Sequence, residues 1–156
     1  MERNLPVLAP LRHSREGMFI LGLITFIAFL GLTNSWYLLT MGVSGDPLIC
    51  NVLDGCNLVA ESPYSKLFGI PLSFFGVMFY FLTLASALGY FIIRHRALRK
   101  AISIMAVLGF LASLWFVYLQ IFVIKALCEY CITSAIFATM LVLLAHLLYR
   151  SEERRI

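Results

Sequence analysis

The sequence predicts an all-α integral membrane protein, a four-transmembrane-helix bundle that forms one domain over residues 1–156. Of these 156 residues, 62% are hydrophobic and only 13% are charged, and the mean hydropathy is +0.93. Soluble domains are nearer half apolar and a quarter charged, so ordinary water-soluble folds are excluded. The apolar residues form four continuous runs, whereas the strands of a transmembrane β-barrel alternate polar and apolar residues. Helices are therefore expected.

Each run is about long enough to cross roughly 30 Å of hydrocarbon as a helix. The first, about residues 18–41, follows three arginines like a signal peptide, but it is too long for a signal h-region and lacks a clear cleavage site, so we expect it to be retained. The second and third runs span about residues 72–93 and 101–124. The fourth covers residues 132–149, and we expect its helix to begin near residue 128. The two loops on the other side are then about 42–71 and 125–131.

The basic residues predict the orientation in the membrane. Ten of the 12 lysines and arginines lie before the first span, between the second and third, or after the fourth: Arg3, Arg12, Arg15, Arg94, Arg96, Arg99, Lys100, Arg150, Arg154 and Arg155. The other two are Lys66 and Lys125. By the positive-inside rule both termini are cytoplasmic and the two remaining loops are extracytoplasmic. The short Arg94–Lys100 cluster is then an anchor beside anionic lipid, and no nucleic-acid partner is expected.

All four cysteines lie in the two loops predicted to be outside, where disulfides persist. Cys128 and Cys131 form a C-x-x-C at the expected start of the fourth helix, where unpaired N–H groups and the helix dipole favour a thiolate. This pair lies at the hydrocarbon boundary, within reach of a lipid-soluble carrier and of a water-soluble protein. Cys50 and Cys56 enclose a turn at Asp54-Gly55 that is suited to bringing their Cα atoms within about 5.5 Å.

Spacing leaves three interpretations of these cysteines open. The first is a relay, in which the loop pair and the helix pair exchange electrons by thiol–disulfide exchange. The second is a pair of structural disulfides. The third is a four-thiolate zinc site, although the five residues between Cys50 and Cys56 exceed the usual spacing.

Three polar residues are further candidates. Ser62 followed by Pro63 predicts a helix N-cap, with Tyr64, Leu67 and Phe68 forming an apolar face on the membrane. Gln120, in the outer half of the third span, needs a partner in the low-dielectric interior, which is either another helix or a quinone. Asn34 in the first span is interpreted in the same way.

The motifs resemble those of the vitamin K epoxide reductase family, particularly its bacterial and archaeal members. The resemblance covers about residues 36–135 and rests on motifs in a fixed order: Cys50, Cys56, Ser62-Pro63-Tyr64, Phe68-Gly69-Ile70-Pro71, Gly76 and Cys128-x-x-Cys131. It implies a four-helix bundle around a quinone, with an extracytoplasmic loop and a short interfacial helix capping the pocket. It further implies that Cys50 exchanges with a partner dithiol, that Cys56 passes electrons to Cys128, and that Cys131 faces the quinone. The Ser62 hydroxyl is then a fifth catalytic candidate, which helps to orient the cysteine chemistry or the quinone.

The resemblance also implies the partners. The quinone is of the ubiquinone, menaquinone or phylloquinone type, with Cys131, Ser62 and Gln120 as candidate contacts and no metal expected. Ala135 and Leu72 stand where vertebrate members carry a tyrosine and an asparagine, so we expect quinone reduction rather than epoxide reduction. Many bacterial relatives carry a fused thioredoxin-like domain, whereas this chain ends at Ile156, so a separate thioredoxin-like or DsbA-like partner is expected at a prokaryotic plasma membrane.

Two alternatives to this function remain. A DsbB-type oxidase performs the same exchange on four helices, but there the C-x-x-C lies in the first outer loop, the reverse of the order seen here. A non-enzymatic membrane scaffold would use the same cysteines only as structural disulfides. It predicts that loss of one cysteine lowers stability rather than turnover.

Overall fold

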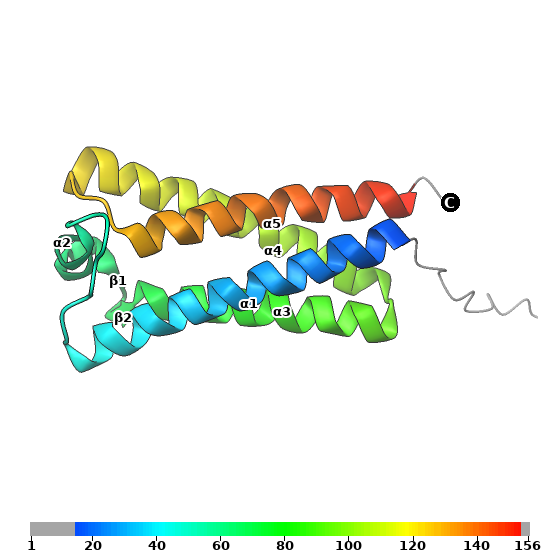
Figure 1. The fold of residues 1–156 in the computed structure, drawn as a ribbon, viewed down its shortest axis with the longest axis horizontal. Helices are drawn as coiled ribbons and strands as arrows, with labels where there is room; N and C mark the ends of the chain where they lie inside the picture. Colours follow the sequence, from blue (N-terminus) through cyan, green and yellow to red (C-terminus); the bar gives the residue numbers. More distant parts are fainter. Residues whose placement is uncertain (1–14, 154–156) are drawn as a thin grey trace, which may run out of the picture.

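The computed structural model describes residues 15–153, and its four long helices lie side by side (Figure 1). They are α1 (Arg15–Ser44), α3 (Leu72–Ile93), α4 (Arg96–Tyr118) and α5 (Glu129–Glu153). Each is long and apolar enough to cross a membrane, with α4 counted together with the helical turn that follows it. The predicted all-α membrane fold is therefore confirmed.

The helix bounds agree with the sequence for α3 and differ elsewhere. Helix α1 extends beyond 18–41 at both ends, and α5 begins one residue after Cys128 and continues to Glu153. Helix α4 begins at Arg96 rather than near residue 101, because the His95 side chain caps it by accepting a hydrogen bond from the Ala97 N–H at 3.2 Å. The basic residues that follow are good helix formers, so hydropathy alone placed this start too late.

The end of the third span is a π-helix, η2 (Leu119–Ile124), that continues α4. It stops at Lys125, which adopts the left-handed conformation at φ 57°, and the Ala126 N–H donates to the Gln120 carbonyl oxygen at 3.1 Å. Short π-helical segments are uncommon and occur often at functional sites. Here the segment turns the chain toward Cys128.

The helices approach one another closely where glycine faces an aromatic ring. A Cβ at Gly31 of α1 would overlap the Tyr80 ring of α3, and one at Gly109 of α4 would overlap the Phe79 ring. The Tyr80 hydroxyl also donates to the Ser134 carbonyl oxygen of α5 at 3.0 Å. These contacts fix α3 against its three neighbours and form the middle of the bundle.

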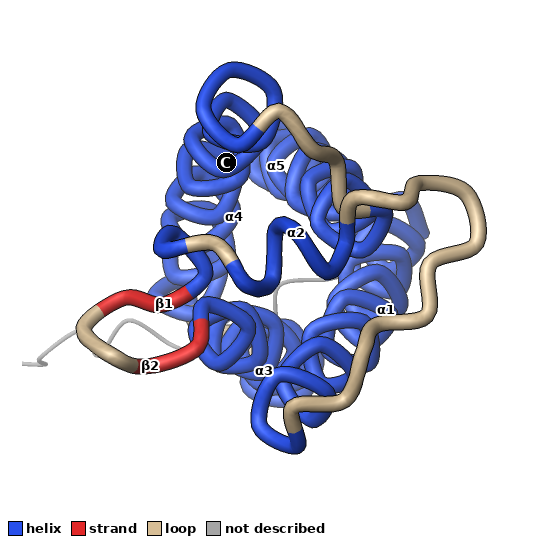
Figure 2. Tube along the Cα trace, turned by 90° about the vertical axis from the view of Figure 1, so that its left-hand side faces the viewer, coloured by secondary structure: helices blue, strands red, loops and turns tan. Residues whose placement is uncertain are grey.

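The connection from α1 to α3 lies across one end of the bundle and contains all the remaining elements. It carries the short helix α2 (Cys56–Glu61), a 3-10 turn η1 (Pro63–Ser65) and a two-residue hairpin of β1 (Lys66–Leu67) and β2 (Ile70–Pro71). Viewed along the bundle, α2 lies over the centre of the four helices (Figure 2). We call this the cysteine end, since all four cysteines lie there.

The prediction of a membrane-lying helix after Ser62 is wrong. Ser62 does precede a helical turn with Pro63 at its first position, but that turn ends at Ser65. The chain then reverses through Phe68 and Gly69, both at positive φ, so Tyr64, Leu67 and Phe68 cannot share one helix face. The short helix of this loop is α2, which precedes Ser62.

Both ends of the described part of the chain, at the start of α1 and at the end of α5, lie opposite the cysteine end (Figure 1). Four of the basic residues that predict the orientation lie outside the described residues: Arg3, Arg12, Arg154 and Arg155. Arg99, assigned to the basic anchor, is buried, and its guanidinium carbon lies 4.9 Å from the centre of the Tyr149 ring. It therefore holds α4 to α5 through a cation–π contact, whereas its neighbours Arg96 and Lys100 are exposed.

Candidate thiol–disulfide site

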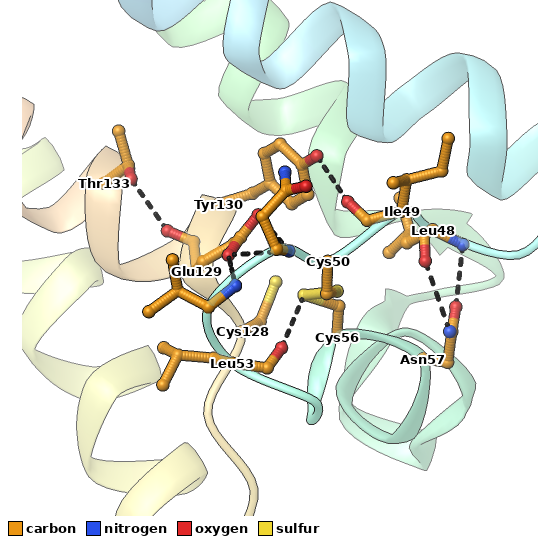
Figure 3. The surroundings of a disulfide bond; sticks show 12 residues. Leu48, Ile49, Cys50, Leu53, Cys56, Asn57, Cys128, Glu129, Tyr130 and Thr133 are labelled. Atoms are coloured by element: carbon orange, nitrogen blue, oxygen red, sulfur yellow. Dashed lines mark hydrogen bonds between the residues drawn. A yellow bond between two sulfur atoms is a disulfide. The ribbon is translucent and has the colours of Figure 1, made fainter.

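The two cysteine pairs meet in one buried cluster. Cys50 and Cys56 form a disulfide with Cα atoms 6.4 Å apart, whereas Cys128 and Cys131 are free. The side chains of Cys56 and Cys128 are 0% and 1% exposed and pack together with Leu48. Figure 3 shows the Cys128 sulfur pointing toward the disulfide. Residues that lie 72 positions apart in the sequence are thus neighbours in one buried cluster.

A glycine allows this close approach. A Cβ at Gly55 would lie 2.6 Å from the Leu127 carbonyl oxygen and 2.7 Å from the Leu127 nitrogen. Both distances are shorter than real Cβ contacts, and the obstructing atoms belong to backbone. Gly55 precedes Cys56 and Leu127 precedes Cys128, so the contact lies beside both sulfurs. The sequence assigned this glycine only to a turn.

Asn57 of α2 holds the chain before the disulfide. Its Oδ1 accepts from the Leu48 N–H at 2.8 Å, and its Nδ2 donates to the Leu48 carbonyl oxygen at 3.4 Å. The pair of bonds fixes the Leu48 backbone while the Leu48 side chain is buried beside Cys56. No sequence motif identified Asn57, because the pairing joins residues with no periodic relation.

Gln120 positions Cys128 from the other side. Its side chain is 2% exposed, and its Oε1 accepts from the Cys128 N–H at 2.9 Å. The amide nitrogen of Gln120 donates to the Phe116 carbonyl oxygen of its own helix at 3.4 Å. Gln120 therefore finds its partner within the protein, at the loop that carries the free dithiol.

The environment of Cys128 favours its thiolate. Cys128 immediately precedes α5, and the Ile132 N–H donates to its carbonyl oxygen at 3.0 Å. A hydrogen bond from the Cys131 thiol, assisted by the N–H groups of Cys131 and Tyr130, lowers the pKa of Cys128 from 9.0 to about 7, against the opposing effects of burial and of the Glu129 charge. The helix-start N–H groups that were predicted to favour the thiolate are thus present. The largest cause of the lowered Cys128 pKa is the hydrogen bond from Cys131.

The residues between the two helix cysteines contact the disulfide loop. The Glu129 carboxylate accepts from the Asn51 N–H at 3.2 Å and from the Val52 N–H at 2.9 Å. The Tyr130 hydroxyl donates to the Ile49 carbonyl oxygen at 2.7 Å. No sequence pattern indicated either contact; the one available signal was the place of both residues inside a C-x-x-C at a helix start.

Asn34 supports the same helix end. Its amide donates to the Tyr130 carbonyl oxygen at 3.1 Å, which joins α1 to α5. This is the helix-to-helix contact considered for a polar residue in the first span. The Tyr130 ring packs on Tyr37 of α1, with ring centres 5.1 Å apart.

Ser62 lies in the same loop but in a different environment. Its hydroxyl donates to the Val59 carbonyl oxygen at 2.7 Å, where it ends α2. Val59 in turn packs against the cysteine cluster. The structure thus links Ser62 to the cysteines through α2 rather than by direct contact.

An open hollow of about 520 Å³ lies beside the cysteine cluster. It is bordered by the disulfide loop, α1 and the start of α5; the lining residues are Asn34, Asn51, Val52, Leu53, Glu129, Tyr130, Ile132 and Thr133. The candidate quinone contacts Cys131, Ser62 and Gln120 do not border this hollow.

Four membrane-spanning helices that carry a disulfide beside a free dithiol at one end define a multi-pass membrane protein with a thiol–disulfide centre. The family model described as "Vitamin K epoxide reductase family" matches residues 22–146. The chain belongs to this family, as the motifs predicted, and is an oxidoreductase of the membrane. A comparison with curated proteins gave no match.

Proposed function

We propose that the protein moves two electrons at a time from the dithiol of a thioredoxin-like protein to a membrane quinone, and so supports disulfide bond formation. The observation that carries the proposal is the packing of Cys56 against Cys128 in one buried cluster, with one pair oxidised and the other reduced. Exchange between the two pairs requires this contact, because Cys56 and Cys128 must meet in a mixed disulfide. Only Cys128 and Cys131 are free in this state.

Electrons enter at Cys50. Cys50 is half-buried whereas Cys56 is fully buried, so a partner thiolate reaches the Cys50 sulfur more easily. Attack there breaks the Cys50–Cys56 bond, releases the Cys56 thiolate and forms a mixed disulfide with the partner. The partner's second thiol then displaces Cys50. The partner leaves with a disulfide, and the loop pair holds two electrons as a dithiol.

The second exchange passes these electrons to the helix pair. The Cys56 thiolate attacks Cys128 of an oxidised Cys128–Cys131 pair, forming a Cys56–Cys128 bond and releasing the Cys131 thiolate. Cys50 then attacks Cys56 and releases Cys128. The products are an oxidised loop pair and a reduced helix pair, which is the combination that the structure contains. The lowered pKa of Cys128 makes it a good leaving group in this last step.

The quinone accepts electrons from the helix pair. Cys128 and Cys131 form a disulfide, and two electrons with two protons convert the quinone, of ubiquinone, menaquinone or phylloquinone type, to a hydroquinone. We assign this step to Cys131, which lies on α5 toward the membrane from Cys128. The polar groups of Ser62 and Gln120 are bonded to backbone, so positioning roles suit them better than quinone contact.

Counting hydroquinone tests this scheme. The fully reduced protein, purified in detergent, is mixed with excess ubiquinone or menaquinone analogue without a partner protein. The wild type should yield two hydroquinones per chain, Cys50→Ala one, and Cys131→Ala none. The Cys50→Ala variant is the matched control, because it loses a cysteine but keeps the helix pair. Absence of hydroquinone from reduced wild type with four accessible thiols would refute the proposal.

We further propose that the cysteine end faces the extracytoplasmic side of a prokaryotic plasma membrane. Arg94, Arg96 and Arg150 gather at the opposite end, while Lys66 and Lys125 are the only cations of the cysteine end among the described residues. An impermeant maleimide should label Gly42→Cys in intact cells but not Arg96→Cys, in a background without the native cysteines. The reverse pattern would refute this orientation.

A further inference from the structure

The two residues inside the C-x-x-C bind the disulfide loop on both sides of Cys50. Tyr130 donates to the carbonyl oxygen of Ile49, which precedes Cys50, at 2.7 Å. Glu129 accepts from the N–H groups of Asn51 and Val52, which follow it. All three loop groups belong to backbone, so the contact depends on where the loop lies rather than on its side chains. Figure 3 shows both residues reaching the loop from the start of α5.

This loop segment has little other support. The side chains of Ile49 and Val52 are 66% and 82% exposed, and the hollow of about 520 Å³ lies beside Asn51 to Leu53. The Cys50 side chain packs against the cysteine cluster, but the residues that flank it gain little from apolar packing, in contrast to Leu48 and Cys56, which are buried. The backbone on both sides of Cys50 is located relative to α5 by the hydrogen bonds that Glu129 accepts and the one that Tyr130 donates.

We propose that Glu129 and Tyr130 form a clasp that positions the Cys50–Cys56 loop for exchange between Cys56 and Cys128. They are positioning residues, since neither touches a reacting sulfur through its polar group. The inference rests on the relay proposed above and extends it: the same C-x-x-C supplies the helix dithiol and the groups that seat its redox partner. Release of the clasp frees Cys50 to move toward an external dithiol.

The clasp acts on the formation of the transient disulfide between Cys56 and Cys128. Thiol–disulfide exchange requires the attacking sulfur to approach in line with the bond that breaks, so its rate and equilibrium depend on how the two sulfurs are held. The effective concentration of Cys56 at Cys128 measures this directly. It requires neither a quinone nor a partner protein, and failure of the clasp is therefore distinguishable from failure of the proposed function.

The experiment uses the full chain with Cys50→Ala and Cys131→Ala, which leaves Cys56 and Cys128 as the two thiols. The protein is equilibrated with reduced and oxidised glutathione, quenched and alkylated, and the fraction carrying a Cys56–Cys128 bond gives the effective concentration. Glu129→Ala removes the acceptor, Glu129→Gln keeps an acceptor oxygen without the charge, and Tyr130→Phe removes only the hydroxyl. Glu61→Gln, at an exposed carboxylate of α2, is the control.

We expect Glu129→Ala to lower the effective concentration about tenfold and Tyr130→Phe to lower it about threefold, with Glu61→Gln unchanged. Glu129→Gln should recover part of the loss. This comparison separates the clasp from the effect of the Glu129 charge, which opposes ionisation of Cys128, because both substitutions remove the charge. Equal values for the Gln and Ala variants, or values equal to that of the parent protein for both Ala and Phe, would overturn the proposal.

Discussion

Replacing Gly55 with alanine tests whether the close approach of the two loops sets the rate of internal electron transfer. The new Cβ would lie 2.6 Å from the Leu127 carbonyl oxygen, whereas ordinary contact begins at 3.4 Å. Gly55 and Leu127 must then separate by about 0.8 Å, since a backbone oxygen cannot rotate away as a side chain can. The Cys128 N–H is bonded to buried Gln120, so the displacement falls mainly on the disulfide loop.

The displacement lies one residue from each reacting cysteine. A misplacement of about 1 Å can cost up to about 10²-fold in rate, so we expect transfer from Cys56 to Cys128 to slow by about 10- to 100-fold. Overpacking should also cost about 1–3 kcal/mol in the free energy of unfolding. The transfer rate should therefore fall even at temperatures where the variant remains folded.

The assay follows the helix pair directly. Protein with both pairs oxidised is mixed with a thioredoxin-like dithiol, quenched at intervals and alkylated, and mass spectrometry measures the free thiols of Cys128 and Cys131. Gly42→Ala is the control, because a Cβ there meets no atom within 4 Å. If folded Gly55→Ala transferred electrons at the wild-type rate, the argument that this contact sets the sulfur geometry would be refuted.

Three further predictions follow from the packing and the site. The ultraviolet absorbance of the Cys128 thiolate should appear as the pH rises, with a midpoint at about 7. Cys131→Ala should move this midpoint upward toward 9.0, because the hydrogen bond that most lowers the Cys128 pKa is lost. An unchanged midpoint would contradict this cause. Gln120→Leu leaves the buried Cys128 N–H without its acceptor and should lower the free energy of unfolding by about 1–3 kcal/mol in chemical denaturation, whereas no change would mean that water replaces the bond. Gly31→Ala places a methyl group in an aromatic ring and should lower the melting temperature, while Gly22→Ala on the same helix, facing open space, should not; similar melting temperatures for the two would argue against close packing at Gly31.

The sequence predicted the membrane fold because hydropathy is a property of composition along the chain. Four apolar runs require four helices in any arrangement that satisfies the backbone in lipid, and the α3 bounds agree with the prediction. Charge was less reliable: Arg99 appeared to be a surface anchor, yet it is buried against Tyr149, because hydropathy does not report which face of a helix meets a neighbour.

The loop between α1 and α3 has a structure that its sequence patterns did not predict. Ser62-Pro63 indicated a helix, but two residues at positive φ, Phe68 and Gly69, turn the chain into a hairpin instead. A capping signal specifies how a helix begins and not how far it continues. The length of such a helix is decided by contacts with the rest of the fold.

The sequence by itself determined the helices, the family and the four cysteines, because each of these is written in local composition or in motif order. Only the tertiary structure brought Cys56 to Cys128, placed Leu127 against Gly55, bonded Gln120 to the Cys128 backbone and joined Glu129 and Tyr130 to the loop around Cys50. Most of these contacts link backbone groups to residues far along the chain. Backbone groups are the same at every position, so their pairing leaves no trace in the sequence until the fold sets the distance.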